Sequence, residues 1–432
     1  MSQPVLVLGG GLAGVACAQA LAESKVSVTL VDRNDYNQFQ PLLYQVATSQ
    51  IPVEDIARPL RAIFREFANV DVVSAEVSSA DFEERELTLV DGRVLSGEAL
   101  VFASGALPNF FGVPGAEDHA FPLYSVVDAE RLRLHLQRLI VDRSAHPDKG
   151  AKPPAHQLDV VVVGAGPTGV ETAGALAELM VALTRTGAID HAGQITLVDH
   201  GPKLLAPYSD KAHEYAHRKL TEARVDVRLG TSVTKVSQEG VDLDDAHVPA
   251  RTVVWAGGEA AARVPWLKGP PPGRGGRIDV NPDLSVPGFP GTYAIGDIAN
   301  VSSGEGPPLP QLGSVAQQSG AWAAENILRL RAGEKSKPFR YKDKGIMAMI
   351  GRNAAIAEVG AHRHQVDGPV AFAAWLGVHA LLLSGVHART DAFMSWAWDY
   401  FDRDHAATVE STASPQRIFG GDDDERPTIV ID

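Results

Sequence analysis

Two stretches of the chain share one order of apolar and polar positions. In the first, the apolar run PVLVL at residues 4–8 precedes a glycine-rich turn, a stretch of helix formers over 15–23 and a second apolar run that ends at Asp32. In the second, the run LDVVVV at 158–163 precedes another glycine-rich turn, a helical stretch and a run that ends at Asp199. Short apolar runs that alternate with helical stretches are typical of parallel strands in α/β proteins. The sequence therefore predicts an α/β fold with two strand–turn–helix–strand units.

The segments around these units predict how the domains are nested. Alternating runs over 86–105 indicate a small antiparallel sheet and a return strand, and a polar linker over 143–157 leads into the second unit. After that unit, an apolar run at 251–258 and a Gly/Pro-rich loop at 269–276 precede the run TYAIGD at 292–297. This last run suggests a return to the first domain, so we predict two nested Rossmann-like domains.

The first glycine-rich turn, Gly9-x-Gly11-x-x-Gly14, has the spacing of a dinucleotide-binding turn. The first glycine makes the tight turn, the second lets backbone amides approach a pyrophosphate, and the third lets the helix pack closely on the strand. The phosphate charge then lies at the positive end of the helix dipole. Asp32 follows Gly14 by 18 residues at a strand end, where a carboxylate can accept hydrogen bonds from ribose hydroxyls. The alternative is a bare glycine-rich turn.

The second turn repeats the pattern as Gly164-x-Gly166-x-x-Gly169. Its acid, Asp199, lies 30 residues after Gly169, and the insertion TRTGAIDHAG at 184–193 explains the longer spacing. Two dinucleotide sites in one chain favour hydride transfer from a nicotinamide to a flavin, with FAD at one site and NAD(P)H at the other.

Asp297, in the returning run, indicates which site holds which nucleotide. Its carboxylate can bind the ribityl or pyrophosphate region of a flavin, which favours FAD at the first site. The alternative for Asp297 is a helix N-cap after a strand.

Composition narrows the class of protein. With 45% hydrophobic and 21% charged residues the chain is a cored globular protein, which excludes disorder and collagen. A net charge of −14 argues against nucleic-acid partners and requires any membrane contact to be mainly hydrophobic. The single cysteine, Cys17, excludes a disulfide framework, a thiolate zinc site and a dithiol relay, and we predict no metal site. No secretory signal is expected, and the cytoplasm fits best.

Several longer stretches together resemble the type II NADH dehydrogenases, the single-subunit NADH:quinone oxidoreductases among the two-dinucleotide flavoprotein reductases. The matching stretches cover nearly the whole chain to about Val409; they are DRNDYNQFQPLLYQVATSQI, VVVVGAGPTGVETAGALAEL, YAIGDIA, YKDKGIMAMIGRNAAIAEVG and WLGVHALLLSGVHART with WAWDYF. The resemblance implies hydride transfer from NADH to FAD and then electron transfer to a quinone, without proton pumping. It also implies peripheral attachment to the inner face of the cell membrane.

The resemblance implies site residues as well. FAD is expected at the first glycine-rich turn, with Gln45 facing the isoalloxazine. The residues expected to bind FAD are Gly9, Gly11, Gly14, Asp32, Gly105 and Asp297. NADH is expected on Gly164, Gly166, Gly169 and Asp199. Further expected cofactor contacts are Leu12, Ala13, Arg33, Val77, Ser104, Pro167, Thr168, Gly257, Gly258 and Gly296. The expected catalytic residues are Glu171 near the nicotinamide–flavin contact, Lys344 near the ring, and Gln318.

The residues alone leave alternatives for these roles. Glu171 is expected to begin a helix, where a glutamate often serves only the helix dipole. Lys344 beside Asp343 can be a surface ion pair. Cys17 lies among alanines and is best explained as a small core residue.

The acceptor side departs from the resembled family. The family motif has Ala-Gln followed by a second glutamine four residues on, and here Gly313 and Ser314 stand at the Ala-Gln positions while Gln318 keeps the second glutamine. Gln317 points about 100° away from Gln318 on a helix and cannot replace the missing amide. We therefore expect a roomier quinone pocket with weaker hydrogen bonding.

The carboxy-terminal part, 369–401, is rich in leucine and tryptophan. Its apolar run over 370–386 contains His379 and is too short for a spanning helix, and Phe393, Trp396, Ala397 and Tyr400 share one helical face. We expect these helices to lie at the membrane interface. The alternative is a hairpin buried against the protein or against a second copy in a homodimer.

These patterns together divide the chain. We predict an FAD-binding domain in two parts, 1–112 and 266–332; a connecting segment, 113–157; an NADH-binding domain, 158–265; a carboxy-terminal domain with membrane-interface helices, 333–409; and a disordered acidic tail, 410–432. Two other functions stay open: a soluble reductase of an iron–sulfur protein or of oxygen, and a non-catalytic NADH-sensing flavoprotein.

Overall fold

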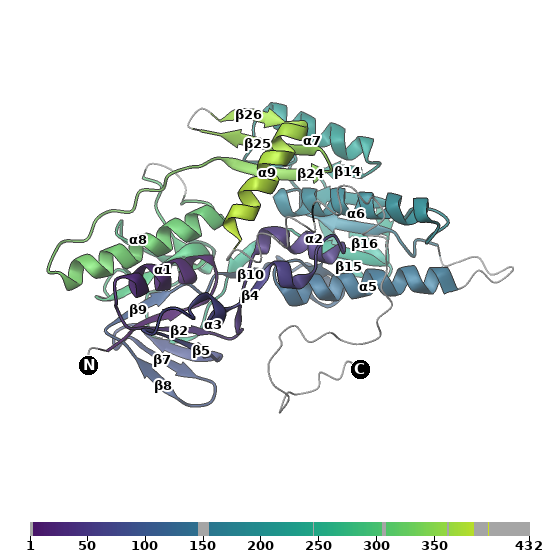
Figure 1. Ribbon diagram of the computed structural model, residues 1–432. Coiled ribbons are helices and arrows are strands. Elements are labelled where there is room, and N and C mark those ends of the chain that lie inside the picture. The colour runs from purple at the N-terminus through teal and green to yellow at the C-terminus, as the bar shows by residue number, and fades with distance from the viewer. Residues whose placement is uncertain are drawn as a thin grey trace.

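The computed structural model of the 432-residue chain describes residues 3–145, 155–244, 246–304, 308–360, 363–383 and 396. Two five-stranded sheets form the centres of two lobes, which lie side by side in Figure 1. All neighbouring strands in both sheets are parallel. The predicted α/β architecture of Rossmann type is confirmed.

The first sheet has the order β22-β9-β1-β2-β5. Its strands are β1 (Val5–Leu8), β2 (Val28–Asp32), β5 (Val70–Ser74), β9 (Ala99–Phe102) and β22 (Thr292–Ala294). Because β22 pairs with β9, the predicted return of the chain to the first domain is confirmed. Two helices, α1 (Leu12–Glu23) and α8 (Gly313–Arg331), pack against each other beside this sheet (Figure 1).

The second sheet has the order β11-β18-β12-β13-β14. Its strands are β11 (Phe121–Pro122), β12 (Val160–Val163), β13 (Ile195–Asp199), β14 (Asp226–Leu229) and β18 (Thr252–Trp255). Helices α5 (Val126–Ala145), α6 (Pro167–Thr186) and α7 (Asp210–Glu222) belong to this lobe. Helix α5 takes up the first residues of the segment expected to be a polar linker, because its buried apolar positions pack in the core that α6 also enters.

Smaller sheets surround the two lobes. The predicted antiparallel sheet contains β6 (Val77–Asp81), β7 (Glu86–Leu89) and β8 (Val94–Ser96), which β20 (Trp266–Lys268) joins. The others are β15 (Val233–Ser237), β16 (Gly240–Leu243) and β17 (His247–Pro249); β24 (Ile346–Gly351), β25 (Ala354–Val359) and β26 (His364–Asp367); and the pairs β3 (Tyr36–Gln38) with β4 (Ala57–Pro59), β10 (Ala106–Pro108) with β19 (Glu259–Ala261), and β21 (Ile278–Asp279) with β23 (Ala299–Asn300).

Short helices complete the described part. They are α2 (Leu43–Ala47), α3 (Leu60–Ile63), α4 (Ala116–His119) and the 3₁₀ turns η1 (Gln40–Leu42), η2 (Val53–Asp55), η3 (Arg274–Gly276) and η4 (Gly296–Ile298).

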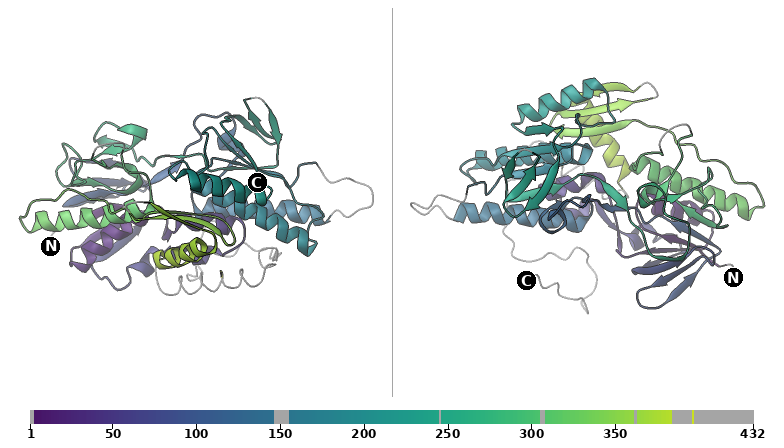
Figure 2. Two further views of the ribbon diagram at one scale, coloured as in Figure 1. Left: turned by 90° about the horizontal axis from the view of Figure 1, so that it is seen from above. Right: turned by 180° about the vertical axis from the view of Figure 1, so that it is seen from behind.

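The last described helix, α9 (Gly368–Leu382), packs on β25 and lies at the periphery in the view from above (Figure 2). Among the residues that the structure describes, no helix is long and apolar enough to cross a bilayer. The predicted helix over 391–401, apart from Trp396, and the predicted tail, 410–432, lie outside the described residues.

Candidate functional site

The turn between β1 and α1 forms a cradle whose shape requires glycine. Gly9 has a φ of 109°, and a Cβ there would lie 2.2 Å from the carbonyl oxygen of Ala103. A Cβ on Gly14 would lie 1.8 Å from the oxygen of Gly9, whereas one on Gly11 meets nothing within 4 Å. The first and third glycines therefore bring helix, strand and neighbouring turn together, while the second faces open space, as the sequence pattern predicts.

The turn between β12 and α6 repeats this geometry. Gly164 has a φ of 108°, and its Cβ would lie 2.4 Å from the oxygen of Ala256. A Cβ on Gly169 would lie 1.7 Å from the oxygen of Gly164, and Gly166 again has nothing within 4 Å. In both cradles the first glycine lies against the carbonyl oxygen of an alanine and the third lies against the carbonyl oxygen of the first, so neither position has room for a side chain.

The acids that follow the cradles are equivalent as well. Asp32 accepts a hydrogen bond of 2.6 Å from the backbone N–H of Gly10, and Asp199 accepts one of 2.6 Å from that of Ala165. The longer sequence spacing of Asp199 has no effect on its position, because the insertion lies at the far end of α6. Burial raises the pKa of Asp32, and the backbone N–H groups of Gly10 and Asn34 oppose that rise.

Ser104 places an unsatisfied hydroxyl group beside the first cradle. Its side-chain oxygen is buried and has no hydrogen-bond partner within the described residues. It precedes Gly105, which has a φ of 74°, and its backbone nitrogen would lie 3.1 Å from a Cβ on Gly9. A buried hydroxyl without a partner is rare in folded proteins, so this atom fits a cradle that receives a polar ligand.

Two carboxyl groups lie where the first cradle meets the second lobe. Asp297 is in η4, and burial raises its pKa to about 6, with the Arg277 guanidinium opposing. Glu259 is the first residue of β19, and part of its surface is exposed to solvent. Burial of its carboxyl group raises the pKa to about 7, and the nearby charge of Asp297 adds to this rise. Ile295 holds the N-cap position of η4, so the alternative of Asp297 as an N-cap is wrong.

Sequence reasoning missed Glu259 and its neighbour Tyr124. The Tyr124 hydroxyl accepts a 3.0 Å hydrogen bond from the N–H of Ala106, the residue after Gly105. Both residues reach the first cradle through long-range pairing, β10 with β19 in the case of Glu259, and no local motif marks them.

Glu171 is buried, with 8% of its surface exposed. Helix α6 begins at Pro167, so Glu171 lies in the second helical turn, and its expected position at the helix start is wrong. Its Oε1 accepts a 3.0 Å hydrogen bond from the N–H of Met349 in β24. Burial raises the pKa of Glu171 to about 8, although this N–H and the indole of Trp375 favour the charged form. The carboxyl group therefore keeps its proton at neutral pH.

Gln45 belongs to a buried polar chain next to Glu171. Its Oε1 accepts a 2.8 Å hydrogen bond from Nε1 of Trp396, and its Nε2 donates to the Tyr44 hydroxyl over 3.1 Å. That hydroxyl donates to Sδ of Met349 over 3.3 Å. Both ends of the Gln45 amide are therefore bound by protein, and its predicted contact with the isoalloxazine stays a prediction.

The residues predicted on the acceptor side lie along α8 and the segment that packs on it, and each has its own partners or is exposed. The half-buried Gln318 uses both ends of its amide on the backbone of Lys342, donating to its carbonyl over 3.1 Å and accepting from its N–H over 3.0 Å. Lys344 is exposed, and Asp343 pairs with Arg363 at 2.8 Å. The alternative of an ion pair between Lys344 and Asp343 is therefore not observed. Ser314 contacts the hydroxyl of Tyr341, a residue that the sequence did not single out.

The remaining predicted contacts lie around the two cradles. Leu12 and Ala13 start α1, and Pro167 and Thr168 start α6. Gly257 and Gly258 follow Ala256, the residue that Gly164 approaches, and Gly296 begins η4. Arg33 is exposed next to Asp32. Val77 begins β6, two residues after Ala75, whose N–H donates to the carbonyl of Asp32.

Cys17 is fully buried in α1, and burial raises the pKa of its thiol to about 12. Its expected role as a small core residue is confirmed. With a single cysteine in the sequence, this protein has no cysteine pair for a redox disulfide.

Comparison with known proteins identifies the family. Residues 3–320 match the family model described as pyridine nucleotide-disulphide oxidoreductase. The type II NADH:quinone oxidoreductase Ndh of Mycobacterium tuberculosis is 33% identical over 413 residues, which cover 91% of this chain and 87% of that protein. The type II NADH:quinone oxidoreductase of Staphylococcus aureus is 29% identical and covers 82% of this chain and 89% of its own length.

A solved structure shows the same fold. NDH2 from Plasmodium falciparum in complex with NADH superposes with a TM-score of 0.85 at 18% identity and covers 94% of this chain and 99% of its own. The resemblance inferred from the sequence motifs is confirmed. The chain belongs to the pyridine nucleotide-disulphide oxidoreductase family and, within it, to the type II NADH:quinone oxidoreductases.

Proposed function

We propose that this protein is an FAD-dependent NADH dehydrogenase that passes electrons to a quinone without pumping protons. The pair of equivalent cradles, each with an acid bound to the amide after its first glycine, carries this proposal. When bound, the flavin accepts a hydride from the nicotinamide and returns electrons to the acceptor. The membership of the family supports the same reaction.

The first cradle holds FAD and the second holds NADH. The open backbone at Gly11 and Gly166 receives each pyrophosphate, and Asp32 and Asp199 accept hydrogen bonds from the ribose hydroxyls. The unpartnered hydroxyl of Ser104 and the carboxyl group of Asp297 fit the polar part of FAD that lies beyond its pyrophosphate. We keep the domain boundaries predicted from the sequence, with FAD bound by residues 1–112 and 266–332 and NADH bound by residues 158–265.

Glu171 holds the proton that the reaction requires. Its carboxyl group is protonated at neutral pH and is fixed by Met349, so it can give a proton at Oε2 and regain it after turnover. We place this group at the contact between nicotinamide and flavin, with Lys344 near the ring and Gln318 on the acceptor side. Because Cys17 has no partner thiol, the acceptor must approach the flavin directly.

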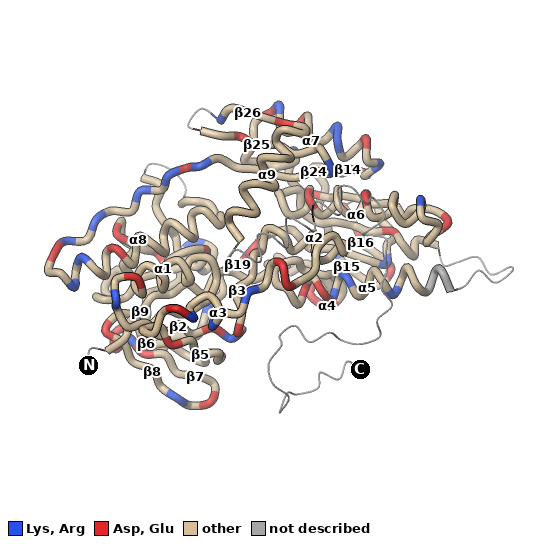
Figure 3. Tube along the Cα trace, viewed as in Figure 1, with Lys and Arg blue, Asp and Glu red and all other residues tan. Residues whose placement is uncertain are grey.

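The protein associates with the inner face of the cell membrane through α9; the rest of the predicted membrane segment to residue 401 lies outside the described residues, except Trp396, which is buried against Gln45. The helix has no Asp, Glu, Lys or Arg, and the tube in Figure 3 shows it without charged positions. Val370 and Leu381 are 68% and 69% exposed, and on such an apolar helix they form a surface suited to a bilayer interface. Burial lowers the pKa of His379 to about 4, so this histidine adds no charge at neutral pH.

Vesicle sedimentation tests the membrane proposal. Leu381→Asp should leave most of the protein in the supernatant, whereas Val181→Asp, at a 62% exposed position on α6, should pellet as the wild type does. Equal pelleting of both variants would reject this face. A homodimer over the same face is the competing proposal, and sedimentation velocity without vesicles distinguishes it.

A steady-state assay with an acceptor panel tests the function itself. The purified yellow protein should release FAD on acid extraction and oxidise NADH continuously when a water-soluble quinone is present. Turnover with ferredoxin or oxygen alone would point to a soluble reductase, and no sustained turnover would point to a sensor.

A further inference from the structure

The acceptor side of the first cradle contains a pair of hydroxyl groups with no assigned role. We propose that the hydroxyl of Tyr341, polarised by Ser314, donates the hydrogen bond that holds the carbonyl oxygen of the quinone. This inference rests on the proposed function and names the residue that recognises its acceptor.

The start of α8 places Ser314 beside the first cradle. Gly313 opens the helix, and a Cβ on it would lie 3.0 Å from Cδ1 of Leu12, in the first cradle. Gln311, just before the helix, donates to the carbonyl of Asp297 over 3.2 Å. A side chain in the first turn of α8 therefore lies next to the groups that surround the flavin.

Gln318 is not free to bind an acceptor. Both of its hydrogen bonds to the Lys342 backbone would have to break before its amide could turn to a quinone. Losing two hydrogen bonds to gain one is unfavourable. Gln318 therefore acts on the acceptor side as a positioning residue, because it holds the segment that contains Tyr341 and does not itself bind the quinone.

The hydroxyls of Ser314 and Tyr341 lie 2.8 Å apart, and Tyr341 is half-buried. Two hydroxyls that share one hydrogen bond retain one donor proton. When Ser314 donates to the phenol oxygen, the Tyr341 proton is the one that remains, and the bond that its oxygen accepts makes it a better donor. A quinone carbonyl accepts hydrogen bonds and cannot donate them, so it is a suitable partner for the Tyr341 hydroxyl.

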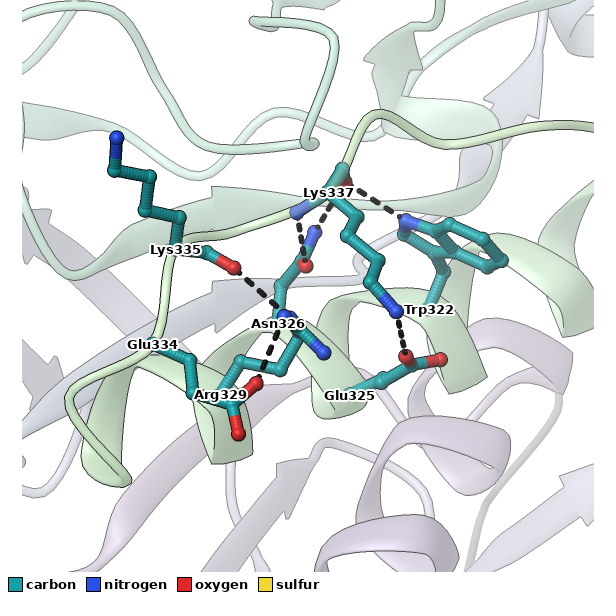
Figure 4. Close-up of polar contacts among 7 residues, drawn as sticks. All are labelled: Trp322, Glu325, Asn326, Arg329, Glu334, Lys335 and Lys337. Atoms are coloured by element: carbon teal, nitrogen blue, oxygen red, sulfur yellow. Dashed lines mark hydrogen bonds and ion pairs between the residues drawn. The ribbon is translucent and has the colours of Figure 1, made fainter.

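A row of contacts with α8 fixes the position of Tyr341. The segment 335–344 runs along α8. Four of the residues that bind it are spaced by four along one helical face: Ser314, Gln318, Trp322 and Asn326. Arg329 and Glu325 of the same helix add a hydrogen bond to the Lys335 carbonyl and an ion pair with Lys337. Figure 4 shows the far end of this row, where Asn326 binds both the N–H and the carbonyl of Lys337 and Trp322 donates to that carbonyl over 3.0 Å. A donor held in this way is already oriented before the acceptor arrives.

Stopped-flow kinetics on the flavin-loaded protein tests the proposal. Tyr341→Phe removes only the hydroxyl and should lower kcat/KM for a water-soluble benzoquinone about tenfold, which corresponds to about 1.4 kcal/mol. Ferricyanide takes single electrons and has no carbonyl, so its reduction and the reduction of flavin by NADH should each stay within about twofold. Ser314→Ala should cause a smaller loss, and Ser314→Thr, which keeps the hydroxyl, should restore quinone use.

Trp322→Phe is the matched control, because it removes one contact with the same segment and leaves both hydroxyls in place. It should affect quinone and ferricyanide alike. Unchanged quinone kinetics in Tyr341→Phe, or an equal loss with both acceptors, would overturn the role of Tyr341. A wild-type protein that NADH reduces but no quinone reoxidises would instead reject the proposed function.

Discussion

Replacing Glu171 with glutamine should make the protein more stable at high pH, and the effect can be worked out from its burial. The glutamine carbonyl can still accept the hydrogen bond from the Met349 N–H, so the variant loses the titratable proton and little packing. Burial raises the pKa of Glu171 from the ordinary 4.5 to about 8. At about 1.4 kcal/mol for each pKa unit, this difference corresponds to about 5 kcal/mol of unfolding free energy.

The sign follows from proton binding. The folded chain holds the Glu171 proton more tightly than the unfolded chain does, so raising the pH favours unfolding. Below pH 4.5 both states are protonated and the group has no effect; from there to about pH 8 it lowers stability by about 1.4 kcal/mol per pH unit, and above pH 8 the loss is constant. Relative to the wild type, Glu171→Gln should gain stability across this window.

Urea unfolding at a series of pH values between 5 and 9 measures this difference in flavin-loaded protein. The urea midpoints of the two proteins should be close at the lowest pH, separate up to about pH 8 and keep a constant difference above it. Glu214→Gln, on the exposed surface of α7, removes a charge from a solvated position and controls for net charge. Parallel midpoint curves for the wild type and Glu171→Gln would refute the reasoning, because the carboxyl group would then titrate alike in the folded and unfolded chains.

Three further predictions follow from the cradles and the acceptor side. Asp199→Ser should lower the ratio of kcat/KM for NADH to that for NADPH by about tenfold, because a carboxylate repels a 2′-phosphate; an unchanged ratio in steady-state assays would count against this role. Gly14→Ala should abolish retention of FAD, since its Cβ would lie 1.8 Å from the oxygen of Gly9, whereas Gly377→Ala, within a helix where a Cβ meets nothing within 4 Å, should retain FAD on a desalting column. Ser314→Gln removes the hydroxyl that polarises Tyr341, so it should weaken the quinone KM several-fold in stopped-flow reoxidation and leave NADH-driven flavin reduction unchanged; a tighter KM would count against the role of Tyr341, because the amide would then bind the quinone in its place.

The cradles could be predicted from sequence because their requirements are local. A left-handed φ at Gly9 and Gly164, and the contact of each third glycine with the first, act within six residues of chain. The strands beside them are short apolar runs that can only be buried. Asp199 was found at an unusual spacing because it ends a strand, and strand ends on the same side of a parallel sheet meet.

The polar surroundings of the cradles could not be predicted in this way. Glu259 and Tyr341 reach the site through pairing between segments far apart in the chain. Glu259 stands in no motif, and the matching stretch that begins at Tyr341 does not indicate that its hydroxyl meets Ser314. The apolar pattern places Glu171 at the start of the helix, whereas Pro167 starts α6 one turn earlier. Strand β24, which is distant in sequence, covers Glu171, so this residue is a buried acid and does not serve the dipole at the helix start.

Anaerobic stopped-flow measurement of the two half-reactions tests the central claim most directly. NADH should bleach the flavin absorbance in a single rapid step, and a water-soluble quinone mixed with the reduced protein should restore it faster than oxygen or ferredoxin does. Reduction by NADH followed by reoxidation that is slower with every quinone than with oxygen or ferredoxin would contradict the proposed NADH:quinone oxidoreductase activity.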